Sequence, residues 1–142
     1  MVRFVAGADD EGEALDAAVD ALRTAGHEVE LLPQDQWPDV AARVAGAVAS
    51  GAADQGLLFC WTGTGTAMAA NKVPGVRAAL VAEPTAAKLS RQHNDANVIC
   101  FGERLIGPAV AEEALRVWLE APFEGGRHAA RVAQLGELDQ KR

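Results

Sequence analysis

The sequence predicts an α/β fold, namely a three-layer α/β/α sandwich of Rossmann-like type with about five parallel strands. Short apolar runs alternate along the chain with longer segments whose apolar residues recur at helical spacing. The short runs are apolar almost throughout, which is typical of strands covered by helices on both faces. Because each connection is long enough to hold a helix, we expect parallel pairing with right-handed crossovers.

Five short runs are expected to form the strands. Each is rich in Val, Ile, Leu or Phe, and each is followed within two residues by proline or a polar residue, as expected of a buried strand and its turn. In chain order they are Val2–Ala8, Glu28–Leu32, Gly56–Cys60, Val76–Ala82 and Asn97–Gly102.

Helical segments separate these runs. In EGEALDAAVDALRTAGH (11–27), Leu15, Val19 and Leu22 recur at helical spacing, and a glycine near the end is a stop signal. The next helix starts either with Asp39 as its N-cap or just after the preceding proline, and a later helix carries proline in its first turn. The remaining helices are expected at Asp39–Ala52, Thr66–Asn71, Pro84–Asn94 and Gly107–Ala121, with a last one after the glycines 125 and 126.

Length and composition limit the classes of function. The 142 residues indicate a single domain, 1–142, with 13 basic and 20 acidic side chains and a net charge of −7. An acidic chain without a basic run is a poor candidate for nucleic acid or membrane binding, and no apolar run approaches the ~20 residues that span a bilayer. The N-terminus turns acidic too early for a signal peptide, and two cysteines make no disulfide framework, so we expect a cytoplasmic protein.

In an open parallel sheet the active site lies beyond the carboxyl ends of the strands. One such end carries the loop TGTGTAM, which contains Gly63 and Gly65. It lacks the third glycine of a dinucleotide fingerprint and the Lys-Ser/Thr of a P-loop. Two interpretations remain open: a turn whose backbone N–H groups bind an anion, or a tight turn that needs glycine only for its geometry.

Other candidate residues also allow two interpretations. Cys60, beside the glycine loop, is either a tuned thiol or a structural core residue. His93 is a catalyst or a surface residue at a helix end. Arg127 and Arg131, spaced i, i+4, either grip a phosphate together or form a solvated helix face. No pair of histidines has metal-ligand spacing along the sequence, so no metal is expected.

Three stretches occur in an order that resembles one family. They are GLLFC followed by TGTG and AANKVPGVRAAL, then SRQHNDANVICFGERLIG, and finally FEGGRHAARV. Together they span about Gly56 to Val132 and resemble the RpiB/LacAB family of sugar-phosphate isomerases. The resemblance implies the same α/β/α fold and an aldose–ketose interconversion through a cis-enediolate, without metal or organic cofactor. It also implies a homodimer with shared active sites, with a homotetramer as the alternative, and a C-terminal helix that reaches the partner.

The resemblance also implies roles for individual residues. Cys60 matches the base that moves the proton, Thr62 the hydroxyl that supports proton movement, and His93 the group that opens the sugar ring. Backbone amides of the glycine loop would hold the enediolate oxygen. The remaining residues expected to contact substrate are Asp9, Asp10, Trp61, Gly63, Thr64, Gly65, Asn94 and the phosphate-binding Arg104, Arg127 and Arg131.

The sequence departs from the family pattern around the substrate pocket. Asp10 stands where the family has a phosphate-contacting histidine, and it either repels the phosphate, binds sugar hydroxyls or faces solvent. Trp61 replaces a glycine, and it either fills part of the pocket or stacks on a flat group. The loop PQDQWPDVA is shortened, with Trp37 and Val40 near the usual tyrosines.

Three hypotheses follow. The first is an isomerase of ribose 5-phosphate or a close sugar phosphate, with Cys60 as the base. The second is a divergent isomerase or epimerase of another sugar, with or without a phosphate, which the changes at Asp10 and Trp61 favour. The third is a non-catalytic sugar-binding protein, against which the retained Cys60, Thr62 and His93 argue.

Overall fold

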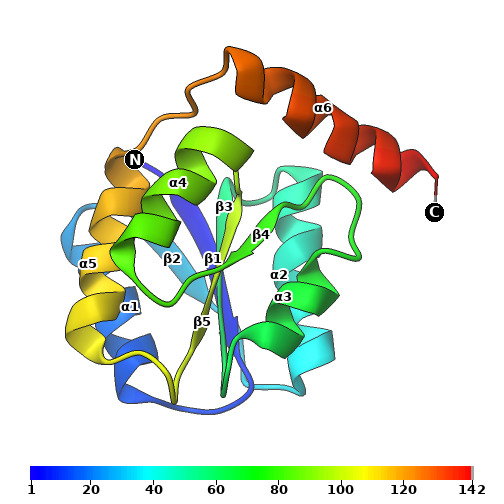
Figure 1. Ribbon diagram of the computed structural model, residues 1–142. Coiled ribbons are helices and arrows are strands. Elements are labelled where there is room, and N and C mark those ends of the chain that lie inside the picture. The colour runs from blue at the N-terminus through cyan, green and yellow to red at the C-terminus, as the bar shows by residue number, and fades with distance from the viewer. Residues whose placement is uncertain (142) are drawn as a thin grey trace.

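A computed structural model describes residues 1–141 and contains one five-stranded sheet in the order β2-β1-β3-β5-β4 (Figure 1). All four strand pairings are parallel. The predicted fold class and strand number are therefore confirmed. The strands are β1 (Arg3–Ala8), β2 (Glu28–Leu31), β3 (Gln55–Cys60), β4 (Ala78–Leu80) and β5 (Val98–Gly102).

Helices cover both faces of the sheet, as three layers require (Figure 1). One face carries α1 (Glu13–Thr24), α4 (Pro84–Asn94) and α5 (Pro108–Glu120), and the other carries α2 (Trp37–Ser50) and α3 (Thr64–Ala70). The last helix, α6 (Arg127–Gln140), lies apart from both layers, across the end of the domain. None of the helices within the described residues combines the length and apolarity needed to cross a membrane.

Successive residues of the central strands pack into two separate cores. Leu57 and Phe59 of β3 belong to the core under α1, α4 and α5, whereas Leu58 belongs to the core under α2 and α3. This alternation is the period of two expected of a strand, and both of its faces are apolar because both are covered. The buried Trp118 indole N–H donates to Gln55 Oε1 at 2.8 Å, so its burial leaves no polar atom unpaired.

Two glycines let α2 approach the sheet closely. A Cβ at Gly7 of β1 would lie 2.3 Å from the Val40 side chain, and one at Gly56 of β3 would lie 2.6 Å from that of Val44. Both distances are far below a van der Waals contact, so larger residues would push the helix away. The packing of α2 against the central strands therefore depends on these two positions.

The structure corrects several predicted element ends. Helix α2 starts at Trp37 with Gln36 before it, two residues earlier than predicted, because Pro38 fits the first helical turn. Helix α3 starts at Thr64 rather than Thr66. Strand β4 shrinks to three residues because it is an edge strand that pairs only with β5.

The topology separates the two ends of the sheet. The carboxyl ends of all strands lie at one edge, where α1, α3 and α4 begin. Helix α4 runs back along the sheet, so its last residues lie at the opposite edge, shortly before β5 begins at Val98. Helix α6 lies at this amino edge too (Figure 1). Near the end of this helix, Asp139 Oδ2 accepts the Gly75 N–H at 2.9 Å. This separation decides where the candidate site residues can meet.

Candidate active site

Cys60 ends β3 and lies buried at the carboxyl edge, with 6% of its surface exposed. The backbone N–H of Gly63 donates to its Sγ at 3.2 Å, and the Thr66 hydroxyl lies 3.4 Å from the same sulfur. Such an N–H···S bond is stronger when its acceptor is charged. Cys100, the other free cysteine, is fully buried, and burial raises its pKa to about 12, so it remains a thiol and belongs to the core as predicted.

The glycine loop turns the chain from β3 into α3. Gly63 is the N-cap residue at φ 78°, a left-handed conformation that favours glycine. A Cβ there would lie 2.6 Å from Leu80 and 2.9 Å from the carbonyl carbon of Phe101. The first turn of α3 includes Thr64 and Gly65, whose N–H groups have no acceptor inside the helix. The loop is thus both a sterically required turn and a source of backbone donors.

Two threonine hydroxyls stand at the mouth of this loop. Thr62 Oγ1 lies 2.7 Å from Thr64 Oγ1, and both side chains are exposed. A hydroxyl pair at this distance shares a proton and leaves acceptor lone pairs and one O–H for a third group. The residues beside Cys60 can therefore receive and donate protons at one place.

The aspartates after β1 behave differently from each other. Ala8 pairs with Phe59, so Asp9 follows β1 beside the end of β3. Partial burial raises the pKa of its carboxyl, with the charge of Asp10 adding to the rise. Asp10 is exposed, and its Oδ1 accepts the Glu11 N–H at 2.9 Å, so part of its hydrogen-bonding capacity is used within its own loop. Asp9 also lines a hollow with Trp37.

Trp61 stacks on a flat group, which was one of its two predicted roles. The Arg104 guanidinium carbon lies 3.7 Å from the centroid of the Trp61 ring, and 51% of the Trp61 surface remains exposed. The Arg104 N–H also donates to the Trp61 carbonyl at 3.1 Å. The indole therefore covers one face of the Arg104 guanidinium. Arg104 remains exposed, so its N–H groups can bind an anion. Trp37 packs close to the loop as well, since a Cβ at Gly65 would lie 3.0 Å from its ring.

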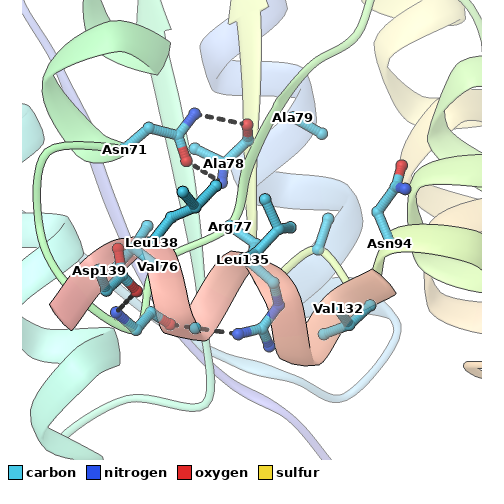
Figure 2. Close-up of a pocket in the computed structure, with 13 residues that line it drawn as sticks. Asn71, Val76, Arg77, Ala78, Ala79, Asn94, Val132, Leu135, Leu138 and Asp139 are labelled. Atoms are coloured by element: carbon cyan, nitrogen blue, oxygen red, sulfur yellow. Dashed lines mark hydrogen bonds between the residues drawn. The ribbon is translucent and has the colours of Figure 1, made fainter. Parts of the chain in front are cut away.

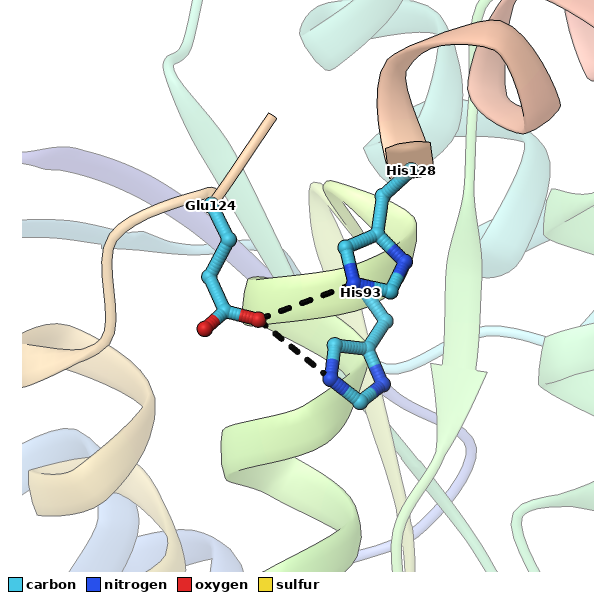
Figure 3. Close-up of side chains that lie close together, drawn as sticks. All are labelled: His93, Glu124 and His128. Atoms are coloured by element: carbon cyan, nitrogen blue, oxygen red, sulfur yellow. Dashed lines mark ion pairs between the residues drawn. The ribbon is translucent and has the colours of Figure 1, made fainter. Parts of the chain in front are cut away.

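The remaining predicted residues lie at the amino edge, at the end of α4 and the start of α6. His93 and His128 stack with their ring centroids 4.3 Å apart and 13° between their planes. Figure 3 shows both rings beside one carboxylate, with Glu124 Oε1 3.4 Å from His93 Nε2 and 3.7 Å from His128 Nε2. Burial, the His93 ring and Arg127 lower the pKa of His128, in that order of effect, which favours its neutral form.

A cationic hollow adjoins these histidines. It is lined by His93, Asn94, Arg127 and Arg131, together with apolar residues of α6. A second groove, also lined by Asn94, lies between α6 and the start of β4 (Figure 2). There the Asn71 side chain holds Ala78 by two hydrogen bonds, with Nδ2 donating to its carbonyl at 2.9 Å and Oδ1 accepting its N–H at 2.8 Å. The described residues that line the hollow beside His93 include two arginines and no carboxylate.

The predicted residues therefore form two half-sites rather than one. The carboxyl-edge half-site consists of Asp9, Asp10, Cys60, Trp61, Thr62, Gly63, Thr64, Gly65 and Arg104, and the amino-edge half-site of His93, Asn94, Arg127 and Arg131. Cys60 pairs with Gly102 at the end of β5, whereas His93 precedes the start of that strand. The strand length between them is roughly 13 Å at about 3.3 Å per residue.

No pair of histidines has metal-ligand spacing along the sequence, yet the fold brings two of them together with a carboxylate. Within residues 1–141, His93, Glu124 and His128 offer ligand atoms that all lie within 4.8 Å of one another. Two imidazoles and one carboxylate are a zinc-type donor set. Imidazole lone pairs lie in the ring plane, however, and these planes are nearly parallel, so one ring would have to turn before both could bind one ion. Arg127 beside them also disfavours a cation.

Sequence reasoning missed four residues that shape the two half-sites. Glu103 accepts the Ala14 and Leu15 N–H groups at 3.0 Å each and so caps α1 from the end of β5. Glu124 and His128 hold His93, and Thr66 contacts the Cys60 sulfur. The position of His128 next to Arg127 and that of Thr66 shortly after Cys60 were usable signals, whereas Glu103 and Glu124 contact residues that lie far away along the sequence.

Comparison with known proteins finds relatives that are similar in both sequence and fold. The family model described as Ribose/Galactose Isomerase matches residues 4–135. Ribose-5-phosphate isomerase B of Escherichia coli is 45% identical over 80% of this chain and 81% of its own length. The D-erythrulose-4-phosphate isomerase of Pectobacterium atrosepticum is 44% identical over 70% and 66%, respectively. The structure of Clostridium thermocellum ribose-5-phosphate isomerase B superposes with a TM-score of 0.93 at 41% identity, covering 98% of each chain.

Proposed function

Because the chain belongs to the ribose/galactose isomerase family and is an aldose–ketose isomerase of sugar phosphates, we propose that it interconverts ribose 5-phosphate and ribulose 5-phosphate. In this reaction a proton moves between C2 and C1 of the opened sugar through a cis-enediolate. The carboxyl-edge half-site supplies the groups that such a transfer needs, namely a base, hydroxyls and backbone donors.

In the proposed mechanism Cys60 is the base. Its thiolate takes the C2 proton of the open aldose, and the resulting thiol returns a proton to C1 of the enediolate to give the ketose. The observation that carries this role is the buried sulfur at the end of β3, 3.2 Å from the Gly63 N–H.

The proposed location is the cytoplasm. Both cysteines are free thiols, which agrees with a reducing compartment.

The glycine loop and the threonine pair complete the proton transfer. The charge that develops on the enediolate oxygen would face the first-turn N–H groups of Thr64 and Gly65. Thr62, whose hydroxyl lies 2.7 Å from that of Thr64, would move the proton between the two substrate oxygens. Asp9, with its raised pKa, would contact the sugar hydroxyls next to Cys60.

We further propose that each active site combines two copies of the chain. Cys60 and His93 lie at opposite edges of one sheet, so a single chain does not bring the base to the ring-opening histidine. Between Arg127 and Gln140, no side chain is buried, and 44% of Leu135 and 57% of Leu138 are exposed. A helix with this apolar surface is suited to pack on a second copy, and a tetramer would consist of two such pairs.

The amino-edge half-site would then bind the phosphate and open the ring. Arg127 and Arg131 face the same hollow as His93, and their guanidinium groups suit a phosphate dianion. His93 would protonate the ring oxygen while its ring is fixed by Glu124 and by stacking on His128. Arg104, held against Trp61, would add a third cation from the other chain.

The test is an isomerase assay with ribose 5-phosphate combined with solvent-proton exchange at the substrate carbon. Cys60→Ala should abolish exchange while sugar phosphate binding persists, and Cys100→Ala, which removes the other thiol, should retain exchange. Loss of roughly a thousandfold in rate is expected for removal of the base. Exchange that continues in Cys60→Ala would assign the base to another group, with Asp9 the nearest carboxyl by register.

A second candidate is a different sugar substrate, and the two tryptophans favour it. Trp61 replaces glycine, and the Trp37 ring lies against the loop at Gly65, so both reduce the space around the reacting carbons. A relative named for D-erythrulose 4-phosphate shows that a shorter sugar is one option to assay. The panel therefore includes D-erythrulose 4-phosphate and unphosphorylated ribose. If kcat/KM is higher for either compound than for ribose 5-phosphate, that compound is the better candidate for the substrate. Binding without turnover of any sugar would indicate a non-catalytic sugar-binding protein.

A further inference from the structure

Thr66 has a fully buried hydroxyl next to the proposed base. Thr66 lies on α3 and is 0% exposed. Among the described residues, the other buried polar side chain is that of Ser90, which is 9% exposed. Burying a hydroxyl costs free energy unless it finds partners. The Thr66 Oγ1 lies 3.2 Å from the Gly63 carbonyl and 3.4 Å from the Cys60 sulfur, and it also interacts with the Cys100 thiol, which stays protonated.

The bond from Thr66 to Gly63 is not needed to pair that carbonyl. The Gly63 oxygen already accepts the Ala67 N–H at 3.1 Å as the first bond of α3. The threonine O–H adds a second bond of the kind that Ser and Thr make to a carbonyl in the preceding turn. The hydroxyl can therefore leave the carbonyl without leaving a buried acceptor unpaired.

Counting protons gives two satisfied states of this group. When Cys60 is a thiol, its S–H donates to Thr66 Oγ1, and the Thr66 O–H donates to the Gly63 carbonyl. When Cys60 is a thiolate, the S–H is gone, and the Thr66 O–H can turn to the sulfur. The sulfur then receives two donors, from the hydroxyl and from the Gly63 N–H at 3.2 Å. No heavy atom has to move between the two states.

We propose that Thr66 is a positioning residue for Cys60, whose hydroxyl turns from the Gly63 carbonyl to the sulfur whenever the thiol gives up its proton. This inference depends on the proposed function, because it assigns Thr66 a task only if Cys60 alternates between thiol and thiolate. A buried anion with one donor is costly, and the second donor stabilises it. The rotation thus lowers the free energy of the state in which Cys60 can act as a base.

The test compares Thr66→Val, which replaces the hydroxyl by a methyl group, with Thr66→Ser, which keeps the hydroxyl. Ionisation of Cys60 is followed by the ultraviolet absorbance of its thiolate against pH, as the difference from the same protein carrying Cys60→Ala. The chain holds no tyrosine, so no tyrosinate signal overlaps. Loss of one charge-assisted hydrogen bond should move the midpoint upward by about one pH unit in Thr66→Val, with about tenfold less thiolate at a given pH. The midpoint of Thr66→Ser should stay within about 0.3 pH units of the wild-type midpoint.

Turnover gives an independent measurement. The kcat of Thr66→Val should fall by about tenfold with KM unchanged, and the acidic limb of its pH profile should move with the absorbance midpoint. Ser90→Ala is the matched control, because the Ser90 hydroxyl is also buried in a helix and donates to the carbonyl three residues earlier, Ala87, at 2.9 Å. It should lower stability without moving the midpoint or the profile.

The proposal is overturned if folded Thr66→Val keeps the wild-type midpoint, or if Thr66→Ser moves as far as Thr66→Val. Should Thr66→Val not fold, the comparison of Thr66→Ala with Thr66→Ser decides in the same way. The absorbance titration uses the free protein, so it stays valid even if Cys60→Ala retains exchange and the proposed function fails. If Cys60 is essential but the midpoint does not move, only the role of Thr66 fails.

Discussion

The two half-sites are built in different ways. At the carboxyl edge, Cys60 and Gly63 are buried and fixed by backbone bonds and close packing, with the loop resting on the end of β5. At the amino edge, His93, Arg127 and Arg131 stand at helix ends, are partly or fully exposed, and are held by side-chain contacts. The proposed base and its glycine loop are thus part of the sheet core, whereas the amino-edge residues lie on the outer helices.

This difference matches the demands of the proposed chemistry. Proton transfer at carbon needs groups held to within a fraction of an ångström, which a loop wedged between two strands provides. Binding a phosphate needs charge and reach, which long side chains on an outlying helix provide. The same α6 that carries the arginines has no buried side chain of its own, so a second copy would both bury its apolar residues and receive its charge.

The largest expected effect tests whether the two half-sites meet across chains. Cys60→Ala and His93→Ala should each be nearly inactive alone, by roughly a thousandfold and a hundredfold. When the two variants are co-refolded, half of the dimers are mixed, and one of the two sites in each mixed dimer is intact. Activity should therefore return to about a quarter of the wild-type value.

A matched pairing shows whether such recovery comes from shared sites. Cys60→Ala mixed with Thr62→Val places both defects in the carboxyl-edge half-site, so every site stays defective and no recovery is expected. Failure of the first mixture to recover at any ratio, with dimers confirmed by light scattering, would mean that each chain uses only its own residues.

The next effect concerns the charge of the amino-edge half-site. Arg127→Gln or Arg131→Gln should raise KM for the sugar phosphate by about ten- to a hundredfold, because each loses a charge-assisted bond to the phosphate. Arg116→Gln is the control, since Arg116 is exposed on α5 and pairs only weakly with Glu120 at 3.6 Å. Steady-state kinetics decide the question, and an unchanged KM in both α6 variants would place the phosphate elsewhere.

A smaller effect tests the one cation of the carboxyl-edge half-site. Trp61→Gly removes the ring that lies 3.7 Å from Arg104 and should raise KM for the sugar phosphate about two- to fivefold, as expected of an exposed cation–π contact. Trp61→Phe should retain most of the affinity. A fall in KM or a gain in kcat on ribose 5-phosphate would show instead that the indole restricts the pocket.

Much of the fold could be predicted because local pattern and global fold agree. The apolar runs match the five strands, and Pro84 and Asn94 bound α4 as predicted. The errors fall where tertiary context overrides local signals. Strand β4 is shorter than its apolar run because it pairs on one side only. Helix α2 begins at Trp37 because Pro38 lies within the first turn of the helix rather than before it.

The candidate site was only partly predictable for a physical reason. Cys60 and the glycine loop are adjacent in sequence, so spacing reveals them. The contacts of His93 with Glu124 and His128 bridge more than thirty positions and depend on where α6 docks. The packing of Arg104 on Trp61 likewise needs two strand ends to lie side by side. Family resemblance named most of these residues, but it did not assign them to two separate edges.

The smallest expected effect concerns α4, which begins at the carboxyl edge of the sheet and ends with His93 and Asn94 of the amino-edge half-site. Its N-cap Glu83 accepts the Thr85 and Ala86 N–H groups at 2.8 and 2.7 Å, and these bonds lower the pKa of its carboxyl. Glu83→Gln should lower the melting temperature by a few degrees at neutral pH. Because the folded pKa lies below the unfolded value of about 4.3, this difference should persist down to about pH 5 and vanish as the pH falls further.

The site at the far end of the same helix gives the second measurement. His93 lies at the last turn of α4 and is held there by Glu124 and His128, so fraying of the first turn should not reach it. Glu83→Gln should therefore keep wild-type kcat and KM at a temperature where both proteins are folded. Thr85→Ser, which leaves the cap bonds in place, should match the wild type in both properties. A stability difference that is the same at pH 3 and pH 7 would show that the carboxylate charge does not cap the helix.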